Sequence, residues 1–256
     1  MSAPASLADV TRRIHVIGIG AGDPAHVTAQ AVSALNDTDV FFVVDKGESS
    51  SDLVGWRYDV CARFIERSRA YRFAELVDPP RERTGDYTAA VTEWHAARAR
   101  LWAQAIETQQ APDEVGAFLA WGDPSVYDST LRILDTVGAH VDIDYDVIPG
   151  ITAIQALTAR HRIPLNDIGE PVLISTGRRL DPGFTGTVVV MLDGDCAFRK
   201  CPPDTRIWWG AYLGTPYELL MSGTVGEIGQ QIVAARADAR ARHGWIMDTY
   251  LLRSPK

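Results

Sequence analysis

The sequence lacks the features that direct a chain to or across a membrane. No apolar run among its 256 residues approaches the roughly 20 residues that a transmembrane helix needs. We find no signal-peptide pattern, and the odd count of three cysteines argues against the disulfide framework of a small secreted protein. We therefore expect a cytoplasmic protein with no membrane partner.

Positive charge and clustered metal ligands are also scarce. Asp and Glu outnumber Lys and Arg by 33 to 25, which gives a formal net charge of −8. Because proteins that bind nucleic acid usually present a basic face to the phosphates, this balance disfavours a nucleic-acid partner. Cys196 and Cys201 have no second Cys or His pair at metal-ligand spacing, so we expect no metal site.

Apolar β-branched runs and helical patterns alternate over the first part of the chain. Strand-like runs end at glycine or proline turns, and a mostly helical stretch extends over residues 48–111. This alternation predicts an α/β domain with a mainly parallel sheet over residues 12–150. The other expected elements are strands at residues 14–19, 40–44, 115–121 and 141–148, and helices at 28–35 and 130–137.

The second part of the chain contains more strands relative to helices, with few helical crossovers between them. This composition of elements predicts a second α/β domain over residues 151–256, with a mixed sheet. The expected elements are strands at residues 171–176, 187–192, 206–212 and 244–252, and helices at 152–160 and 225–239.

A glycine-rich loop, Gly18-Ile19-Gly20-Ala21-Gly22-Asp23-Pro24, connects the first strand to the first helix. Glycines at such a turn let the backbone approach a ligand closely. A dinucleotide site would need a third glycine at position 23, where Asp23 would instead face the pyrophosphate. A P-loop is excluded because no Lys followed by Ser or Thr comes after the glycines. Asp45, at the end of the second strand, keeps the dinucleotide alternative open, and a tight turn without a ligand is the third interpretation.

Two later turns have the same character. Trp121-Gly122-Asp123-Pro124 and Pro149-Gly150-Ile151-Thr152-Ala153 each follow a strand-like run. Open α/β sheets bind ligands at the carboxyl ends of their strands, so these turns would converge on one site if their strands are neighbours. Thr152 would either cap its helix or offer its hydroxyl to a ligand.

Four segments, in this order, resemble the tetrapyrrole (corrin and porphyrin) methylases, and together they span about residues 14–165. They are residues 16–24, Gly122-Asp123-Pro124-Ser125-Val126-Tyr127, Ile148-Pro149-Gly150-Ile151-Thr152-Ala153 and Arg162-Ile163-Pro164-Leu165. The resemblance implies an S-adenosylmethionine-dependent methyltransferase that releases S-adenosylhomocysteine. It also implies two α/β domains with the cofactor in a cleft between them, and a homodimer.

The same resemblance, carried over position by position, implies which residues line the cofactor pocket. They are Pro24, Trp121, Gly122, Asp123, Val126, Thr152 and Ala153, with Met191 or Leu192 and Tyr212 or Leu213 near contact positions of the second domain. Residues 244–248 depart from the family pattern, so no contact is carried over to them.

Residues 78–98 narrow the resemblance to members that methylate C1 of precorrin-5 in cobalamin biosynthesis and release acetate. The segment contains Asp78-Pro79-Pro80-Arg81-Glu82-Arg83, followed by Tyr87, Val91, Trp94, His95 and Arg98. Precorrins carry many carboxylates, which Arg side chains bind well. The expected substrate-binding residues are Arg81, Arg83, Trp94, Arg98, Arg178 and Arg179.

Methyl transfer from a sulfonium mainly requires donor and acceptor to be held in line, so it needs no metal. Release of acetate asks for a water and a base, for which Asp45, His95 and Asp123 are the candidates. Three alternatives stay open: a family member with another acceptor (another precorrin, a protein or ribosomal RNA), a dinucleotide-dependent oxidoreductase, and a ligand-binding or assembly protein of the same fold.

Overall fold

The structure, a computed structural model, describes residues 11–45, 51–66, 70–79, 87–244 and 246–255. The chain forms two compact units. The first is built from residues up to Gly20 and from Pro24–Gly150, and the second from Ala21–Asp23 and the residues from Ile151 onward. In the described ranges, no helix is both long and apolar enough to cross a membrane.

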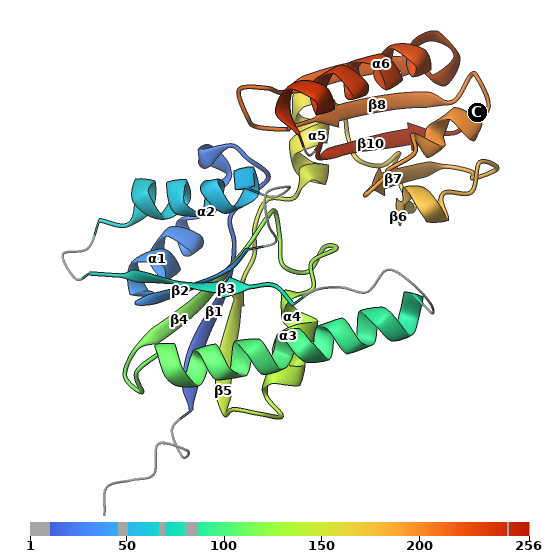
Figure 1. Cartoon of the computed structure of the whole chain (residues 1–256). Helices are drawn as coiled ribbons and strands as arrows, with labels where there is room; N and C mark the ends of the chain where they lie inside the picture. Colours follow the sequence, from blue (N-terminus) through green and yellow to red (C-terminus); the bar gives the residue numbers. More distant parts are fainter. Residues whose placement is uncertain (1–10, 46–50, 67–69, 80–86, 245, 256) are drawn as a thin grey trace, which may run out of the picture. The chain divides into compact units, whose positions relative to one another are not determined.

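The first unit contains a five-stranded sheet in the order β3-β2-β4-β1-β5, and every strand pair in it is parallel (Figure 1). The predicted parallel sheet is therefore confirmed. Its elements are β1 (Arg12–Gly18), α1 (Ala29–Asp37), β2 (Val40–Asp45), α2 (Ser51–Phe64), β3 (Arg72–Val77), α3 (Tyr87–Gln109), β4 (Val115–Ala120), α4 (Thr130–Val137) and β5 (Ile143–Ile148).

The prediction that residues 48–111 are mostly helical is wrong for β3. This edge strand buries Ala74 and Leu76, whereas Arg72 and Glu75 point to solvent. A half-exposed edge strand alternates apolar and polar residues over only a few positions. Within a charged stretch flanked by helical patterns, so short an alternation is not distinguishable from part of a helix.

Apolar side chains cover both faces of this sheet, as a parallel sheet requires. One core joins α3 and α4 to strand residues such as Val16 and Phe118. The other joins α1 and α2 to Ile17 and Leu119 on the opposite face. In the inner strands β2 and β4, consecutive residues therefore enter different cores, which explains why these two strands are almost continuous apolar runs in the sequence.

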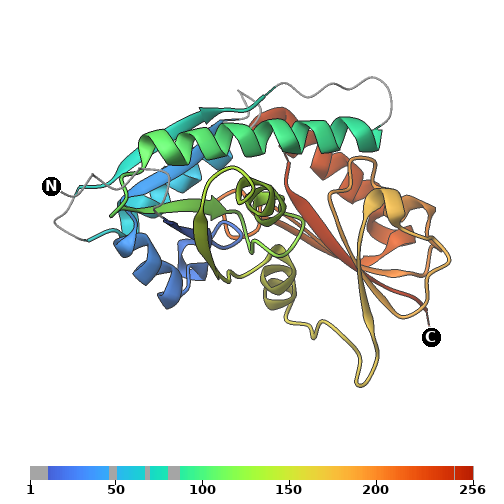
Figure 2. The ribbon, with the colours of Figure 1, turned by 90° about the horizontal axis from the view of Figure 1, so that it is seen from below.

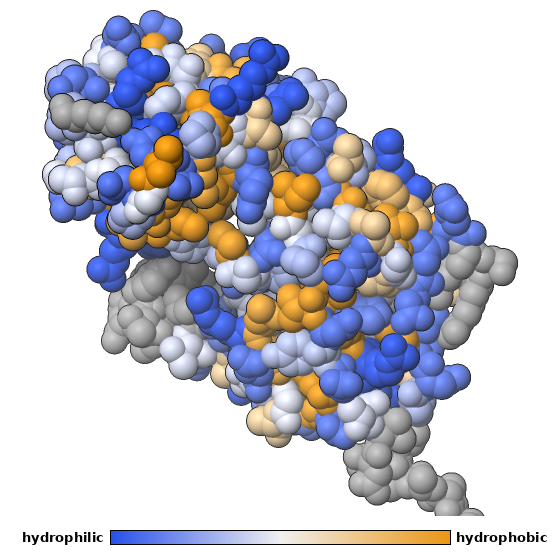
Figure 3. Space-filling view, turned by 180° about the vertical axis from the view of Figure 1, so that it is seen from behind, coloured by the Kyte–Doolittle hydropathy of each residue, from blue (hydrophilic) through white to orange (hydrophobic). Residues whose placement is uncertain are grey.

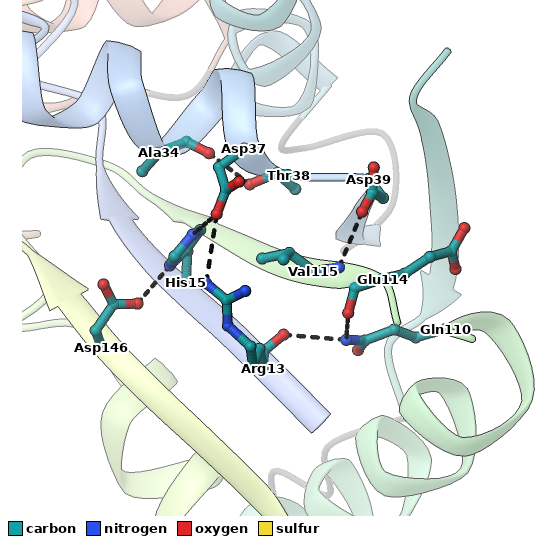
Figure 4. A network of polar contacts seen from close by, with 10 residues as sticks. All are labelled: Arg13, His15, Ala34, Asp37, Thr38, Asp39, Gln110, Glu114, Val115 and Asp146. Atoms are coloured by element: carbon teal, nitrogen blue, oxygen red, sulfur yellow. Dashed lines mark hydrogen bonds and ion pairs between the residues drawn. The ribbon is translucent and has the colours of Figure 1, made fainter. Parts of the chain in front are cut away.

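A polar cluster fixes the register of the edge strand β5 against β1 (Figure 4). His15 lies directly opposite Asp146, and its ring Nδ1 contacts that carboxylate. Its Nε2 lies 3.3 Å from Asp37 Oδ2 at the end of α1, and Arg13 reaches the same carboxylate at 3.5 Å. A slip by one residue would separate these partners and turn the side chains of β5 to the other face.

The second unit contains a mixed sheet in the order β6-β7-β10-β8-β9, in which only β6 and β7 pair in parallel. The predicted mixed sheet is thus confirmed, although β9 was not predicted. Its elements are α5 (Ala153–His161), β6 (Val172–Thr176), β7 (Thr187–Met191), β8 (Arg206–Ala211), β9 (Leu219–Thr224), α6 (Val225–His243) and β10 (Asp248–Arg253).

Helix α6 packs on one face of this second sheet and α5 on the other. Ala21, from the glycine-rich loop, lies in the core beneath α5 beside Leu157 and Leu213. An extended segment leads from α5 to β6, which forms one edge of the sheet (Figure 2).

Candidate functional site

The turns that follow β1, β4 and β5 meet at glycines. The Gly122 N–H donates to the carbonyl of Gly20 at 2.8 Å, and the Gly20 N–H donates back to the carbonyl of Gly122 at 3.2 Å. A Cβ on Gly150 would lie 2.0 Å from the Gly122 oxygen, and one on Gly18 would lie 2.6 Å from the Gly150 nitrogen. The three backbones therefore approach more closely than any other residue type would allow.

These turns lie at a topological switch point of the first sheet. Neighbouring strands β1 and β4 are followed by α1 and α4, which cover opposite faces. The chain thus leaves the two strands in opposite directions, and open α/β sheets bind their ligands at the carboxyl ends of such strands. The glycine-rich loop and the Gly122-Asp123 turn are both at this place.

Asp123 joins two of the turns through its carboxylate. Its Oδ2 accepts a hydrogen bond of 2.8 Å from the Gly150 N–H, and its Oδ1 accepts one of 2.8 Å from the Ser125 N–H and another from the Ser125 hydroxyl. Burial alone would raise the pKa of Asp123, but these hydrogen bonds outweigh it and hold the pKa below its usual value. An ionised carboxylate with both oxygens engaged organises the turns, and this geometry favours a positioning role over the predicted role as a base.

Four residues with left-handed backbone lie in turns after strands, and one of them is Cys196, with a φ of 55° in the turn after β7. Tyr127 has a φ of 52° in the loop after β4, Leu192 a φ of 52° after β7, and Tyr212 a φ of 49° after β8. Such conformations are costly for residues with a Cβ, and they concentrate at ligand sites. Leu192 and Tyr212 are also two of the residues predicted to contact the cofactor.

Thr152 caps helix α5. Its hydroxyl oxygen accepts from the Ile154 N–H at 3.1 Å, and the Gln155 side chain accepts from the Thr152 N–H at 3.0 Å. The residue is 6% exposed. Of the two interpretations of this threonine, the structure shows the cap.

The other predicted cofactor contacts differ in how accessible they are. Leu213 is 4% exposed and packs in the core of the second unit, whereas Leu192 is 58% exposed. The remaining ones are half-buried, and they are Pro24, Trp121, Val126, Ala153, Met191 and Tyr212.

Arg98 and Trp94 belong to a polar anchor at the end of β3. Arg98 is 2% exposed and binds the Asp78 carboxylate through both Nε and Nη2, the latter at 2.6 Å. Its guanidinium lies 3.9 Å from the centroid of the Trp94 ring, and the Trp94 indole N–H donates to the Pro79 carbonyl at 3.0 Å. This geometry favours an anchoring role for both residues over the predicted contact with substrate. His95 is half-buried, with its ring 5.3 Å from that of Trp94.

Of the other predicted substrate and catalytic residues, the structure describes the side chains of some and not of others. Arg178 and Arg179 are exposed on a short 3-10 helix directly after β6. Asp45 ends β2, although its side chain lies outside the described residues, as do Arg81 and Arg83. In the described part of the chain, no group of three or more His, Cys, Asp or Glu residues is arranged to hold a metal ion.

The sequence model of the Tetrapyrrole (Corrin/Porphyrin) Methylases matches residues 13–229 of this chain. The chain belongs to this family. Membership confirms the resemblance seen in the four motifs, and it removes the dinucleotide-dependent oxidoreductase as an alternative. The converging glycine turns are thus part of a methylase fold.

Individual relatives in this family cover nearly the whole chain. Precorrin-6A synthase (deacetylating) from Sinorhizobium sp is 48% identical over 249 residues, which are 94% of this chain and 95% of the relative. The crystal structure of a cobalamin synthesis related protein (CobF) from Corynebacterium diphtheriae is 41% identical, with a TM-score of 0.80 over 95% of this chain and 98% of that one. The structure of uroporphyrin-III C-methyltransferase from Thermus thermophilus with S-adenosylhomocysteine is 18% identical, with a TM-score of 0.59 over 94% and 97% of the two chains, and shows the fold alone.

Arg57 is a residue near the site that sequence reasoning missed. Strand β2 pairs with β4 only as far as Phe42 and Phe118, and the Arg57 Nε donates to the next carbonyl, that of Leu119, at 3.0 Å. Burial lowers the pKa of Arg57, and the charge of Asp128 opposes this shift. Arg57 therefore supplies a hydrogen bond to β4 where its pairing with β2 has ended, just before the Gly122 turn. A single Arg within a helical pattern gives no sequence signal for this role.

Proposed function

We propose that the chain is an S-adenosylmethionine-dependent C-methyltransferase of cobalamin biosynthesis, which methylates C1 of precorrin-5 and releases acetate to give precorrin-6A. The observation that carries this proposal is the 48% identity, over almost the full length of both chains, with a precorrin-6A synthase (deacetylating). The site geometry supports it, because the turns at Gly20, Gly122 and Gly150, which belong to the motifs shared with the methylases, meet backbone against backbone.

The described residues fit S-adenosylmethionine at the carboxyl ends of β1 and β4. The turns there present backbone rather than side chains, with Gly20 and Gly122 at φ values of 78° and 69°. Pro24, Trp121 and Val126 are half-buried in the same turns, so part of each side chain is available to a ligand. On the family resemblance, we further propose Ala153, Met191 and Leu192 as cofactor contacts.

The bound cofactor supplies an activated methyl group, and the chain supplies position. Hydrogen bonds at Gly20, Gly122 and Asp123 fix the turns, so the methyl group can be held in line with an acceptor carbon. Positioning of this kind is worth roughly 7–11 kcal/mol of the barrier. We further propose that Arg81, Arg83, Arg178 and Arg179 bind the substrate's carboxylates.

For the release of acetate, Asp45 is the candidate base with the best position. It is the last residue of β2, which is the neighbour of β4, and the carboxyl ends of parallel strands meet at one edge of a sheet. Asp123 has both oxygens engaged, and His95 lies on α3 beside Trp94. Asp45→Asn should therefore retain cofactor binding and lose the release of acetate.

Incubation with precorrin-5 and methyl-labelled S-adenosylmethionine tests the proposal. Label in the corrinoid, together with one equivalent of free acetate, is expected. Labelled product without acetate would instead assign the chain to another acceptor within the family. If calorimetry detected no binding of S-adenosylhomocysteine, the chain would be a binding or assembly protein of the same fold.

We also propose that the chain works as a homodimer in the cytoplasm. Supporting this, β6 is an edge strand on which Leu173 is 58% and Ile174 43% exposed, and nearby Ile168 is fully exposed. Apolar surface gathers on the second unit at the side where Figure 1 places β6 and β7 (Figure 3). Exposed apolar patches commonly mark protein interfaces. Light scattering should give twice the chain mass, and Leu173→Asp should lower it towards the mass of one chain.

A further inference from the structure

Asp193 lies at the centre of a buried polar network in the second unit. It comes two residues after the end of β7, and it is 5% exposed. Its Oδ2 accepts from the Tyr250 hydroxyl at 2.6 Å and from the Ala197 N–H at 2.6 Å, and its Oδ1 accepts from the Asp195 N–H at 3.0 Å. The carboxylate therefore joins β10 to the turn that contains it.

The backbone of the same turn is held from α6. The Arg236 guanidinium donates to the Asp193 carbonyl at 2.7 Å and to the Gly194 carbonyl at 3.2 Å. Its Nε lies 3.1 Å from Asp248 Oδ2, which also accepts from the Trp209 indole at 2.9 Å. These bonds fix the residues that immediately follow Leu192, whose left-handed φ of 52° needs such support.

A second turn rests directly on the Asp193 carboxylate. A Cβ on Gly177 would lie 2.3 Å from Asp193 Oδ1, so only glycine leaves room for this contact. Gly177 is the first residue of the short 3-10 helix that carries Arg178 and Arg179. The position of the two arginines thus depends on the same side chain that fixes the turn after β7.

We infer that Asp193 is a positioning residue shared by two parts of the methylase site, the cofactor-contacting turn at Met191 and Leu192 and the carboxylate-binding turn at Arg178 and Arg179. This inference rests on the proposed function. Its physical basis is that one buried carboxylate contacts both turns, so its replacement displaces both together. A residue that only stabilised the fold would leave the two binding properties unchanged in the folded protein.

Asp193→Asn is the decisive variant, since it keeps the shape and removes the charge. The amide can accept at only one of its two ends, so the N–H of Ala197 or of Asp195 would face an NH2 group. Asp195→Asn is the matched control, because it makes the same chemical change at an exposed position of the same turn. Tyr250→Phe is a milder variant that removes one hydrogen bond to Asp193 and leaves both backbone bonds.

The full-length protein is assayed for S-adenosylhomocysteine affinity by calorimetry, for KM and kcat with the tetrapyrrole substrate, and for folding by circular dichroism. For folded Asp193→Asn we expect a cofactor affinity about tenfold lower and a KM about tenfold higher, as the loss of about 1.4 kcal/mol would give in each case. Tyr250→Phe should show smaller changes of the same sign in both quantities, and Asp195→Asn should stay within about twofold of the original protein.

The possible results separate cleanly. If folded Asp193→Asn bound both ligands normally, or lost only one of the two affinities, the shared positioning role would be overturned. If Asp193→Asn did not fold, the S-adenosylhomocysteine affinity and the KM of Tyr250→Phe would test the shared role instead. If the unaltered chain itself bound no S-adenosylhomocysteine, the proposed function would fail first, whatever the variants did.

Discussion

The Asp123 carboxylate accepts a hydrogen bond from the Gly150 backbone N–H at 2.8 Å, which joins the turn after β4 to the turn after β5. This bond crosses between two loops that are 27 residues apart in sequence. The side chain thus stabilises the loop geometry in which Gly18, Gly122 and Gly150 pack backbone against backbone.

Asp123→Asn should weaken cofactor binding without unfolding the protein. The amide would keep one acceptor oxygen, so either the Gly150 N–H or the Ser125 N–H would lose its partner. Hydrogen bonds to a charged group contribute about 1.5–3 kcal/mol, so we expect the S-adenosylhomocysteine Kd to rise at least about tenfold. Calorimetry measures this change, and an unaltered Kd would show that the hydrogen bonds to the Asp123 carboxylate do not support the cofactor site.

The stabilisation by Asp123 should depend on pH in a defined direction. Its pKa in the folded chain is lowered, so the folded state favours the ionised form. The contribution is therefore fully present above the unfolded pKa of about 3.9 and is lost as the pH falls through the lower folded value. The difference in unfolding free energy between the original protein and Asp123→Asn should stay constant above about pH 5 and shrink below about pH 4. Urea unfolding at several pH values checks this, and a gap that widened in acid would contradict it.

The sequence was sufficient to predict the two sheets, because their central strands are apolar runs that end at Gly and Pro turns. It also predicted the turns at Gly18, Gly122 and Gly150, since glycine is the one residue that allows such close approach. The role of Arg98 could not be predicted in the same way. A surface cation and a buried ion pair with Asp78 have the same helical spacing, and only tertiary packing distinguishes them. Asp193 was missed for the same reason, because its partners are up to 57 residues away.

Gly150→Ala should disrupt the meeting point of the turns. Its Cβ would lie 2.0 Å from the Gly122 carbonyl oxygen, and a backbone atom held in a sheet turn moves little to relieve the clash. Overpacking of this kind costs about 1–3 kcal/mol, measurable as a lower urea midpoint, and it should also weaken S-adenosylhomocysteine binding. Gly55→Ala in α2 is the matched control, because nothing lies within 4 Å of its added Cβ. The control should be neutral or up to about 1 kcal/mol more stable. Equal effects in the two variants would refute the packing argument.

Arg98→Met should destabilise the protein strongly, because it leaves the Asp78 carboxylate without its guanidinium. Removing one member of a buried ion pair costs about 3–5 kcal/mol, whereas replacing both members by apolar residues is often close to neutral. The double variant Asp78→Leu with Arg98→Met should therefore recover much of the loss. Urea unfolding of the single and double variants measures the coupling between the residues. A loss below about 0.5 kcal/mol in Arg98→Met would indicate that the pair is a surface contact instead of an anchor.

Arg178→Ala should impair substrate binding and leave cofactor binding intact. Arg178 is exposed on the short helix after β6, and a guanidinium there would pair with an acetate or propionate group of the tetrapyrrole. Loss of one charge-assisted hydrogen bond of about 1.5 kcal/mol would raise KM about tenfold, with kcat and the S-adenosylhomocysteine Kd little changed. Because the contact is electrostatic, the effect should diminish at high salt. Arg240→Ala, at an exposed position of α6, removes the same charge elsewhere in the unit and should leave KM unchanged. If both variants raised KM equally, the effect would come from net charge, and the turn after β6 would not be the carboxylate-binding part of the site.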